Sequence, residues 1–252
     1  MVTIDLNCDM GEGCGNDAEL MKYVSSANVA CGFHAGDLQT MRATVELALE
    51  HGVAIGAHPG YRDRENFGRV AMEIALNDIF DLVAEQIRTM VGVCEENGTV
   101  LHHVKPHGAL YNQAATNSEL AATIARAVAS IDPDLILYGL SGSLLISEAR
   151  KAGLRTASEV FADRTYQPDG SLTPRSHSEA LMNDDKKAVA QVLQMIRSRT
   201  VTAITGETVE ITADTLCIHG DSEHAVGFAK SIREAMAATG VRVMSPRLGR
   251  LA

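Results

Sequence analysis

The sequence predicts an α/β fold of the (β/α) barrel class. Segments with the pattern of strands alternate with segments that have the helical period, which is typical of a parallel sheet covered by helices. The length of 252 residues suits a single barrel domain, so we predict one domain over residues 1–252. Charged and polar residues also recur where the predicted strands end, which is where parallel βα folds build their active sites.

The first predicted strand, residues 2–9, is organised by strict alternation. Successive side chains of a strand point to opposite faces, so one face is apolar and the other carries Asp5, Asn7 and Asp9. The glycines on either side of Glu12 permit backbone angles that other residues avoid. We therefore expect a sharp turn that brings Glu12 back over the end of the strand.

The remaining elements follow in order along the chain. Further strands are predicted at 26–32, 53–58, 99–105, 135–139, 154–161 and 214–219, with an additional short strand at 241–244. Helices are predicted from an N-cap at Asp37 to a stop at Gly52, from a cap at Asp78 through Cys94, from near Ser118, up to Gly153, and over 222–240.

Two insertions interrupt this alternation. Residues 162–182 have no clear period, and a loop of that length in a compact domain is usually functional or disordered. Residues 200–212 have the pattern of a β-hairpin with Gly206 at the turn. Neither insertion resembles a linker between domains.

The inner face of the predicted barrel is polar. In most strands one set of alternate residues is apolar and suits contact with the outer helices, while the other set is small or polar. The polar set comprises Asp5, Asn7, Asp9, Asn28, His58, His103, Lys105, Glu159, Cys217 and His219. Bulky branched residues usually fill such a barrel, so these residues indicate a site sunk into the barrel mouth.

Candidate site residues gather where six strands end. They are Asp9 and Glu12, His34, His58 and Asp63, Lys105, His107 and Tyr111, Glu159, Asp163 and Arg164, and His219 and Asp221. A purely structural barrel has little use for so many titratable groups at one rim, which indicates an active site.

Three kinds of chemistry fit these residues. In a metal-dependent hydrolase, Asp9, His34 and His58 would hold a divalent ion that activates water. In metal-free amide hydrolysis, a carboxylate or imidazole would activate water, Lys105 would stabilise the oxyanion and Arg164 would hold a substrate carboxylate. In a non-catalytic subunit, the same groups would only bind a small acid. The sequence leaves these alternatives open, and it contains no recognised ATP-binding motif.

Composition limits the kinds of partner that the chain is expected to bind and the cell compartment in which it is expected to occur. The formal net charge of −10 argues against nucleic acids and anionic membranes as partners. No stretch approaches the ~18 apolar residues of a membrane span, and no signal peptide is evident. The five cysteines are scattered and odd in number, which is typical of reduced thiols, so we expect a cytoplasmic protein.

Six blocks of the sequence resemble the LamB/YcsF family, to which the A component of the ATP-hydrolysing 5-oxoprolinase belongs. These blocks are Asp-Leu-Asn-Cys-Asp-Met-Gly-Glu-Gly, Ser-Ala-Asn-Val-Ala-Cys-Gly-Phe-His-Ala-Gly-Asp, Gly-Ala-His-Pro-Gly-Tyr-Arg-Asp, His-Val-Lys-Pro-His-Gly-Ala-Leu-Tyr-Asn, Glu-Val-Phe-Ala-Asp-Arg-Thr-Tyr and Ile-His-Gly-Asp. They extend over residues 5–221, nearly the whole chain.

The resemblance implies a fold, a reaction and partners. The implied fold is a seven-stranded, distorted TIM-like barrel of the glycoside hydrolase/deacetylase type. The implied reaction opens 5-oxo-L-proline to L-glutamate with hydrolysis of ATP, and the implied partners are the B and C subunits of the 5-oxoprolinase. The candidate residues then divide into a catalytic set (Asp9, His34, His58, Lys105, His107, Glu159 and His219) and a substrate-binding set (Asn7, Glu12, Asp63, Tyr111, Asp163, Arg164 and Asp221). The resemblance leaves open whether the site binds a divalent metal, for which Asp9, His34 and His58 are the candidate ligands.

Overall fold

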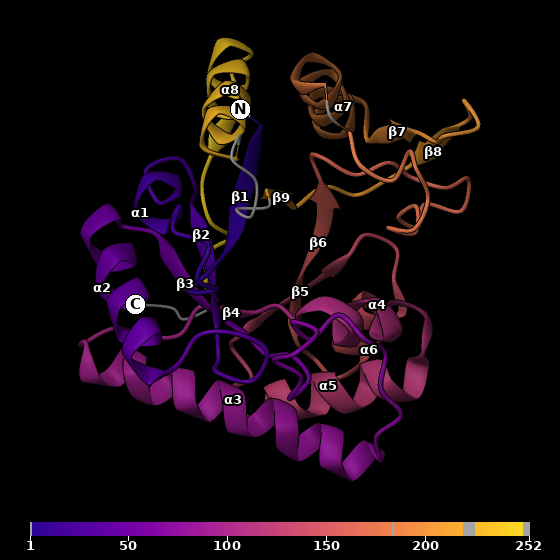
Figure 1. Cartoon of the computed structure of the whole chain (residues 1–252). Coiled ribbons are helices and arrows are strands. Elements are labelled where there is room, and N and C mark those ends of the chain that lie inside the picture. The colour runs from indigo at the N-terminus through magenta and orange to yellow at the C-terminus, as the bar shows by residue number, and fades with distance from the viewer. Residues whose placement is uncertain (1, 183, 219–224, 249–252) are drawn as a thin grey trace.

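Seven parallel strands close into a barrel in the computed structural model, which describes residues 2–182, 184–218 and 225–248 (Figure 1). The strands are β1 (Thr3–Met10), β2 (Ser26–Ala30), β3 (Ala54–His58), β4 (His103–Val104), β5 (Ile136–Leu140), β6 (Arg155–Phe161) and β9 (Thr215–Ile218). Each strand pairs with the next in this order, and β9 pairs with β1 to close the ring. The predicted seven-stranded α/β barrel is therefore confirmed.

The short strand β10 (Arg242–Val243) lies outside this ring. It pairs with Thr3 and Ile4 at the beginning of β1, whereas β9 pairs with the following residues, 5–8. The strand predicted at 241–244 therefore exists, but it extends the sheet next to the first residues of β1 and is not an eighth barrel strand.

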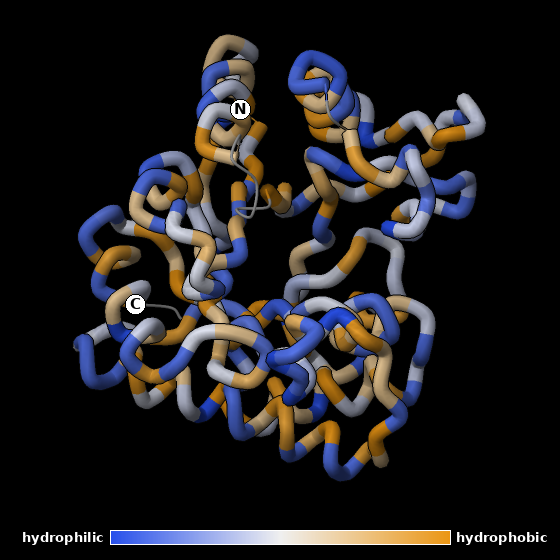
Figure 2. Tube along the Cα trace, in the orientation of Figure 1, coloured by the Kyte–Doolittle hydropathy of each residue, from blue (hydrophilic) through white to orange (hydrophobic). Residues whose placement is uncertain are grey.

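Helices surround the barrel and cover its apolar outer face. They are α1 (Asp17–Leu20), α2 (Leu38–His51), α3 (Leu76–Glu96), α4 (Gly108–Thr116), α5 (Ser118–Ile131), α6 (Leu144–Lys151), α7 (Asp185–Ser198) and α8 (Ala225–Ala238). The long helices α3 and α5 lie side by side (Figure 1). Hydrophilic and hydrophobic residues alternate along α3, as expected for a helix with one buried face (Figure 2). The main core lies between these helices and strand residues such as Leu6, Val29 and Val104.

Capping explains where two of the predicted helices begin and end. The Asp37 carboxylate accepts a hydrogen bond from the Thr40 amide at the start of α2, and Gly52 ends that helix in a left-handed conformation with φ 66°. The predicted start of α3 was wrong, because the helix begins at Leu76 and Asp78 lies in its first turn. An acidic residue is favourable at either place, so the sequence alone does not separate them.

Two further predictions need correction around β4. The strand predicted at 99–105 is reduced to His103–Val104, and Pro106, which has no amide proton to donate, follows soon after it. Helix α4 begins directly after His107, in a segment that we interpreted only as a polar strand end. Helices α1 and α7 were not predicted either.

The insertion between β6 and β9 forms a separate layer beside the barrel. Residues 162–182 contain only isolated bridges, including Arg164 with Leu181 and Tyr166 with Leu172. They are followed by α7 and by the antiparallel strands β7 (Thr200–Thr202) and β8 (Thr208–Glu210). Figure 1 shows α7, β7 and β8 close together, near the end of β6. Among the residues described, no helix is long and apolar enough to cross a membrane.

Candidate active site

A hydrogen-bonded network of polar side chains fills the barrel interior, as the alternation of residues predicts. Asn28 donates to the side-chain oxygens of Asn7, at 2.7 Å, and Asp9, at 2.8 Å. Asn7 in turn donates to Glu159 at 3.0 Å and to Thr215 at 2.7 Å. These contacts join strands β1, β2, β6 and β9 across the lumen, so the network fixes the carboxylates that the barrel presents to its mouth.

Lys105 is the buried cation of this network. Its ammonium lies 2.9 Å from both Asp9 Oδ1 and Glu159 Oε1, and it also contacts Asn7 Oδ1 and Cys217 Sγ at 3.2 Å. Burial alone would lower the pKa of Lys105, but the neighbouring carboxylates outweigh burial and hold that pKa well above its usual value. Lys105 therefore stays charged, and its three protons are directed at protein groups.

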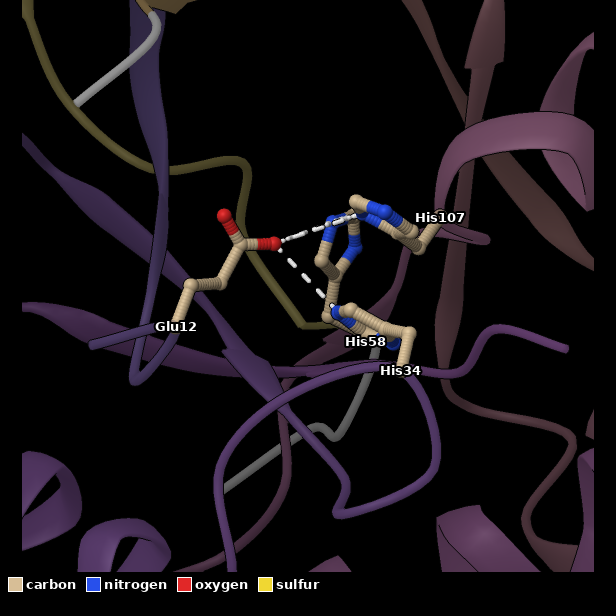
Figure 3. A group of neighbouring side chains, drawn as sticks. All are labelled: Glu12, His34, His58 and His107. Carbon is tan, nitrogen blue, oxygen red and sulfur yellow. Dashed lines mark hydrogen bonds and ion pairs between the residues drawn. The ribbon is translucent and has the colours of Figure 1, made fainter. Parts of the chain in front are cut away.

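Three histidines and a glutamate converge beside this network (Figure 3). The Glu12 Oε1 atom lies 3.3 Å from His107 Nδ1, 3.3 Å from His34 Nε2 and 3.8 Å from His58 Nε2. His58 Nε2 and His107 Nδ1 are 2.9 Å apart. In the part of the chain that the structure describes, these four residues are the group whose donor atoms could together hold a metal ion.

Backbone carbonyls decide which ring nitrogens carry protons. His58 Nδ1 lies 2.7 Å from the Lys105 carbonyl, and His107 Nε2 lies 2.9 Å from the Phe67 carbonyl. Since a carbonyl oxygen only accepts, both of these nitrogens donate. The other nitrogens of the two rings face each other and present lone pairs when both imidazoles are neutral.

Burial disfavours charge on the members of this cluster. Burial first, and then the neighbouring His58, lower the pKa of His34 and of His107 to about 3. Burial and the nearby Asp9 carboxylate raise the pKa of Glu12. Each shift disfavours the charged form of its group, which is the usual effect of a site with little water.

The loop after β3 packs tightly around the histidines. A Cβ on Gly60 would lie 2.6 Å from His34 Nδ1, and one on Gly68 would lie 2.9 Å from the His34 Cβ. Phe67, whose carbonyl accepts from His107, has a positive φ of 56°, a conformation that costs a bulky residue energy. The strained backbone at Phe67 and the close packing of Gly60 and Gly68 together hold the histidine rings in place.

A pocket of about 500 Å³ opens above the cluster. Asp9, Glu12, His58, Lys105 and His107 are among its lining residues. Arg69, Arg164 and Arg175 also line it, together with uncharged polar residues such as Asn112 and Thr173. The pocket therefore combines proton acceptors with positively charged groups.

The structure brings together most of the predicted site residues. Asp9, Glu12, His58, Lys105, His107, Tyr111 and Arg164 line the pocket, while Asn7, His34 and Glu159 contact those residues from behind. Tyr111 donates a 2.7 Å hydrogen bond to Glu159. His219 and Asp221 lie outside the described residues.

Three residues predicted for the site form hydrogen bonds within the loops. The Asp63 carboxylate accepts from the Asn66 amide in the loop after β3, and Asp63 is absent from the pocket lining. Asp163 also does not line the pocket, and its carbonyl accepts from the Met182 amide. Arg164 does line the pocket, but its guanidinium donates to the Thr173 and Ala180 carbonyls of the long loop.

The candidate metal set differs from the predicted one. Asp9 is not among the four convergent residues: its Oδ1 atom is bound to Lys105 and Asn28, although its Oδ2 atom lies 3.3 Å from His58 Nε2. Glu12 and His107, which we predicted in other roles, join His34 and His58 instead. Strand alternation does not reveal how the loops fold, so it could not show that Glu12 and His107 take the place of Asp9 in the candidate metal set.

Other residues of the site were missed. Asn28 appeared in the polar set but not among the candidates, although it orients Asp9. Arg69 and Arg175 lie in loop segments without a regular pattern, so no sequence signal marked them.

At the opposite end of the lumen, the buried Asp5 accepts hydrogen bonds from four hydroxyl groups. The donors are Ser25, Ser26, Tyr138 and Thr215.

Comparisons with known proteins agree with this fold and extend over nearly the whole chain. The chain is 55% identical over 251 residues to a protein of Geobacillus kaustophilus named as the A subunit of 5-oxoprolinase, covering 98% of each chain. It is 54% identical to the protein of the same name from Tolumonas auensis, covering 96% of this chain and 99% of the relative. A "Lactam Utilization Protein" from Thermus thermophilus has a similar solved structure, with a TM-score of 0.92, 42% identity, and coverage of 97% of this chain and 100% of that one.

More distant structures share the fold alone. A putative cellobiose-phosphate cleavage protein from Enterococcus faecalis has a TM-score of 0.55 at 14% identity, covering 97% of each chain. A structure described as "T48 deacetylase with substrate" has a TM-score of 0.51 at 12% identity, covering 96% of this chain and 87% of that one. The sequence profile of the LamB/YcsF family matches residues 4–249, and with relatives above 50% identity over almost their full length this chain belongs to the LamB/YcsF family.

Proposed function

We propose that this chain is the A subunit of an ATP-dependent 5-oxoprolinase and carries the site that opens the lactam ring of 5-oxo-L-proline. The observation that carries the proposal is the near full-length similarity to proteins that bear this name. The pocket supports it independently, because a small cyclic amide with a carboxylate needs both proton acceptors and positive charge.

Asp9 is the residue that we assign as general base. Lys105 and Asn28 hold its Oδ1 atom, and its side chain is 14% exposed at the pocket. In the proposed reaction, Asp9 removes a proton from water as the oxygen adds to the lactam carbonyl carbon. The ring C–N bond then breaks, its electron pair stays on nitrogen, and the proton held by Asp9 passes to that nitrogen.

Two arginines of the pocket lining are assigned to the substrate carboxylate. Arg69 and Arg175 line the pocket, and a guanidinium suits a carboxylate because it can donate two parallel hydrogen bonds. Arg164 also lines the pocket, but its guanidinium already donates to the Thr173 and Ala180 carbonyls. Lys105 is assigned to hold Asp9 rather than the substrate, since its protons are already directed at protein groups. The oxyanion role considered for Lys105 is therefore not part of the proposal.

ATP and partner subunits complete the proposal. A lactam is a resonance-stabilised amide whose ring closes readily, so coupling to ATP makes opening favourable. We expect ATP to be used together with the B and C subunits, and we expect the complex to work in the cytoplasm, where its thiols stay reduced.

The test is release of glutamate from 5-oxoproline and ATP. The chain is assayed alone and with the B and C subunits, as wild type, as Asp9→Asn and as Asp81→Asn, a matched change of an exposed carboxylate on α3. We expect activity only with the partners, loss of about 10²-fold or more in Asp9→Asn, and no loss in Asp81→Asn.

Other outcomes would contradict specific parts of the proposal. Activity of the chain alone would place ATP use on this chain. Full activity of Asp9→Asn in the complex would make the barrel a non-catalytic lactam-binding component. Inactivity of the assembled complex on 5-oxoproline would favour a metal-dependent deacetylase or another amide hydrolase.

A further inference from the structure

We infer that Glu12, His58 and His107 bind a single divalent transition-metal ion in the wall of the pocket, with His34 as the residue that orients Glu12. The inference concerns this chain alone and does not depend on the proposed reaction. Three observations carry it: the directions of the nitrogen lone pairs, the distances between the donor atoms and the orientation of the His34 ring.

The lone pairs of His58 and His107 point toward one another. Their outer nitrogens donate to the Lys105 and Phe67 carbonyls, so the inner nitrogens, 2.9 Å apart, would repel if both rings were neutral and nothing lay beside them. An added proton or a cation relieves this repulsion. Metal-binding histidines commonly donate their second nitrogen to a backbone carbonyl in this way, which fixes the tautomer and the ring direction.

The spacing of the three donor atoms suits a metal. Zinc binds nitrogen and oxygen ligands at about 2.0–2.1 Å, so two ligands of a tetrahedral site lie about 3.3 Å apart. The three distances here are 2.9 Å for His58 to His107, 3.3 Å for Glu12 to His107 and 3.8 Å for Glu12 to His58. Two histidines and a glutamate are also a known ligand set of catalytic zinc sites, in which a fourth position stays open.

His34 is better suited to support the site than to bind the metal. Its ring stacks on His107 with 3.8 Å between centroids and only 2° between planes, so one ion cannot lie in the planes of both rings (Figure 3). The His58 and His107 rings, in contrast, are almost perpendicular, at 86°. His34 Nε2 lies 3.3 Å from Glu12 Oε1 and donates to it when Glu12 is ionised, and the Nδ1 atom packs against Gly60 without a hydrogen bond.

A second carboxylate lies directly beside the proposed ligands. The Asp9 Oδ2 atom is 3.3 Å from His58 Nε2, while Asp9 Oδ1 contacts Lys105, and Arg69, Arg164 and Arg175 also line the pocket. All three proposed ligands line the pocket, whereas His34 does not, so the open side of the site faces the pocket. An ion held there would supply Lewis-acid activation of a carbonyl or of water.

Metal binding by the purified full-length chain tests this inference. The protein is stripped with a chelator and titrated with Zn²⁺ by calorimetry and with Co²⁺ by visible absorption, because Co²⁺ absorbs strongly at low coordination number and weakly when hydrated. The variants are Glu12→Gln, His58→Gln, His107→Gln and His34→Asn, and His51→Asn changes an exposed histidine on α2 as the matched control. Circular dichroism verifies that each variant is folded.

We expect one ion per chain in the wild type and in His51→Asn. Binding should be lost in each of the three ligand variants and weakened by about 10–100-fold in His34→Asn, as is usual when a residue that orients a ligand is removed. No saturable binding by the wild type would overturn the inference. A proton shared between His58 and His107 would then explain their short contact. Binding that survives in Glu12→Gln, or complete loss in His34→Asn, would overturn the assignment of the ligands.

Discussion

Replacing Lys105 by methionine tests whether the buried ammonium holds the lumen together. Methionine keeps the length and apolar character of the side chain but leaves the Asp9 and Glu159 carboxylates without their cation. Removing one partner of a buried ion pair typically costs about 3–5 kcal/mol, because the remaining charge stays buried and uncompensated. For a chain of this size we expect the melting temperature to fall by about 6–20 °C.

The dependence of this loss on pH follows from the same ion pairs. In the wild type the raised pKa of Lys105 keeps its contribution to stability fully present at neutral pH, and the contribution is lost only as the pH rises through that pKa. In Lys105→Met this contribution is absent, so the deficit in unfolding free energy should be of similar size at about pH 6 and about pH 8, both below the pH at which the wild type loses the contribution.

Urea denaturation at both pH values measures the effect. Lys22→Met is the matched control, because the Lys22–Glu19 pair is also short, at 2.6 Å, but its side chains are 49% and 57% exposed. That change should cost less than about 1 kcal/mol. Lys105→Met combined with Glu159→Gln should recover part of the loss. A cost for Lys105→Met as small as that of the control, or one that disappears between about pH 6 and about pH 8, would refute the reasoning.

Three other changes probe packing, the long loop and the far end of the lumen. Gly56→Ala should cost about 1–3 kcal/mol because its Cβ would overlap the His103 ring, whereas Gly92→Ala, with open space in α3, should add about 0.5–1 kcal/mol; equal effects in chemical denaturation would contradict this. Arg164→Met removes two hydrogen bonds to loop carbonyls, so hydrogen exchange over residues 165–182 should accelerate while exchange in the barrel strands is unchanged. Burial raises the pKa of Asp5, so the folded chain binds a proton at Asp5 more tightly than the unfolded chain, and the contribution of Asp5 to stability falls as the pH rises above about 4. The unfolding free energy of Asp5→Asn should therefore increase relative to that of the wild type with rising pH, and a difference that stays constant would argue against this reasoning.

The strands and the polar lumen were predictable because both follow from local alternation. A period of two in β1 assigns Asp5, Asn7 and Asp9 to one face, and tertiary packing had only to place that face inside. The apolar stripe of α3 is equally local, although its first residue is not.

The composition of the convergent cluster was not predictable in the same way. Glu12 reaches the histidines because Gly11 and Gly13 adopt positive φ angles of 71° and 85°, and the sequence permits that turn without requiring it. The use of Arg164 also depends on distant structure. Residues 162–182 have little regular structure, so their carbonyls need donors from elsewhere, and a buried guanidinium supplies them.

Closure of the barrel by β1 and β9 has a consequence for how the protein is made. Asp5 and Thr215, whose side chains are 2.6 Å apart, are separated by 210 positions in the chain. During synthesis β1 emerges first and can pair with β2, but the edge of β1 that pairs with β9 stays unpaired until β9 has been made. Pairing across such a separation slows folding and leaves an exposed strand edge that is prone to wrong association. The nascent chain is therefore expected to need protection until most of it has been translated, because the lumen network cannot assemble before its final strand arrives.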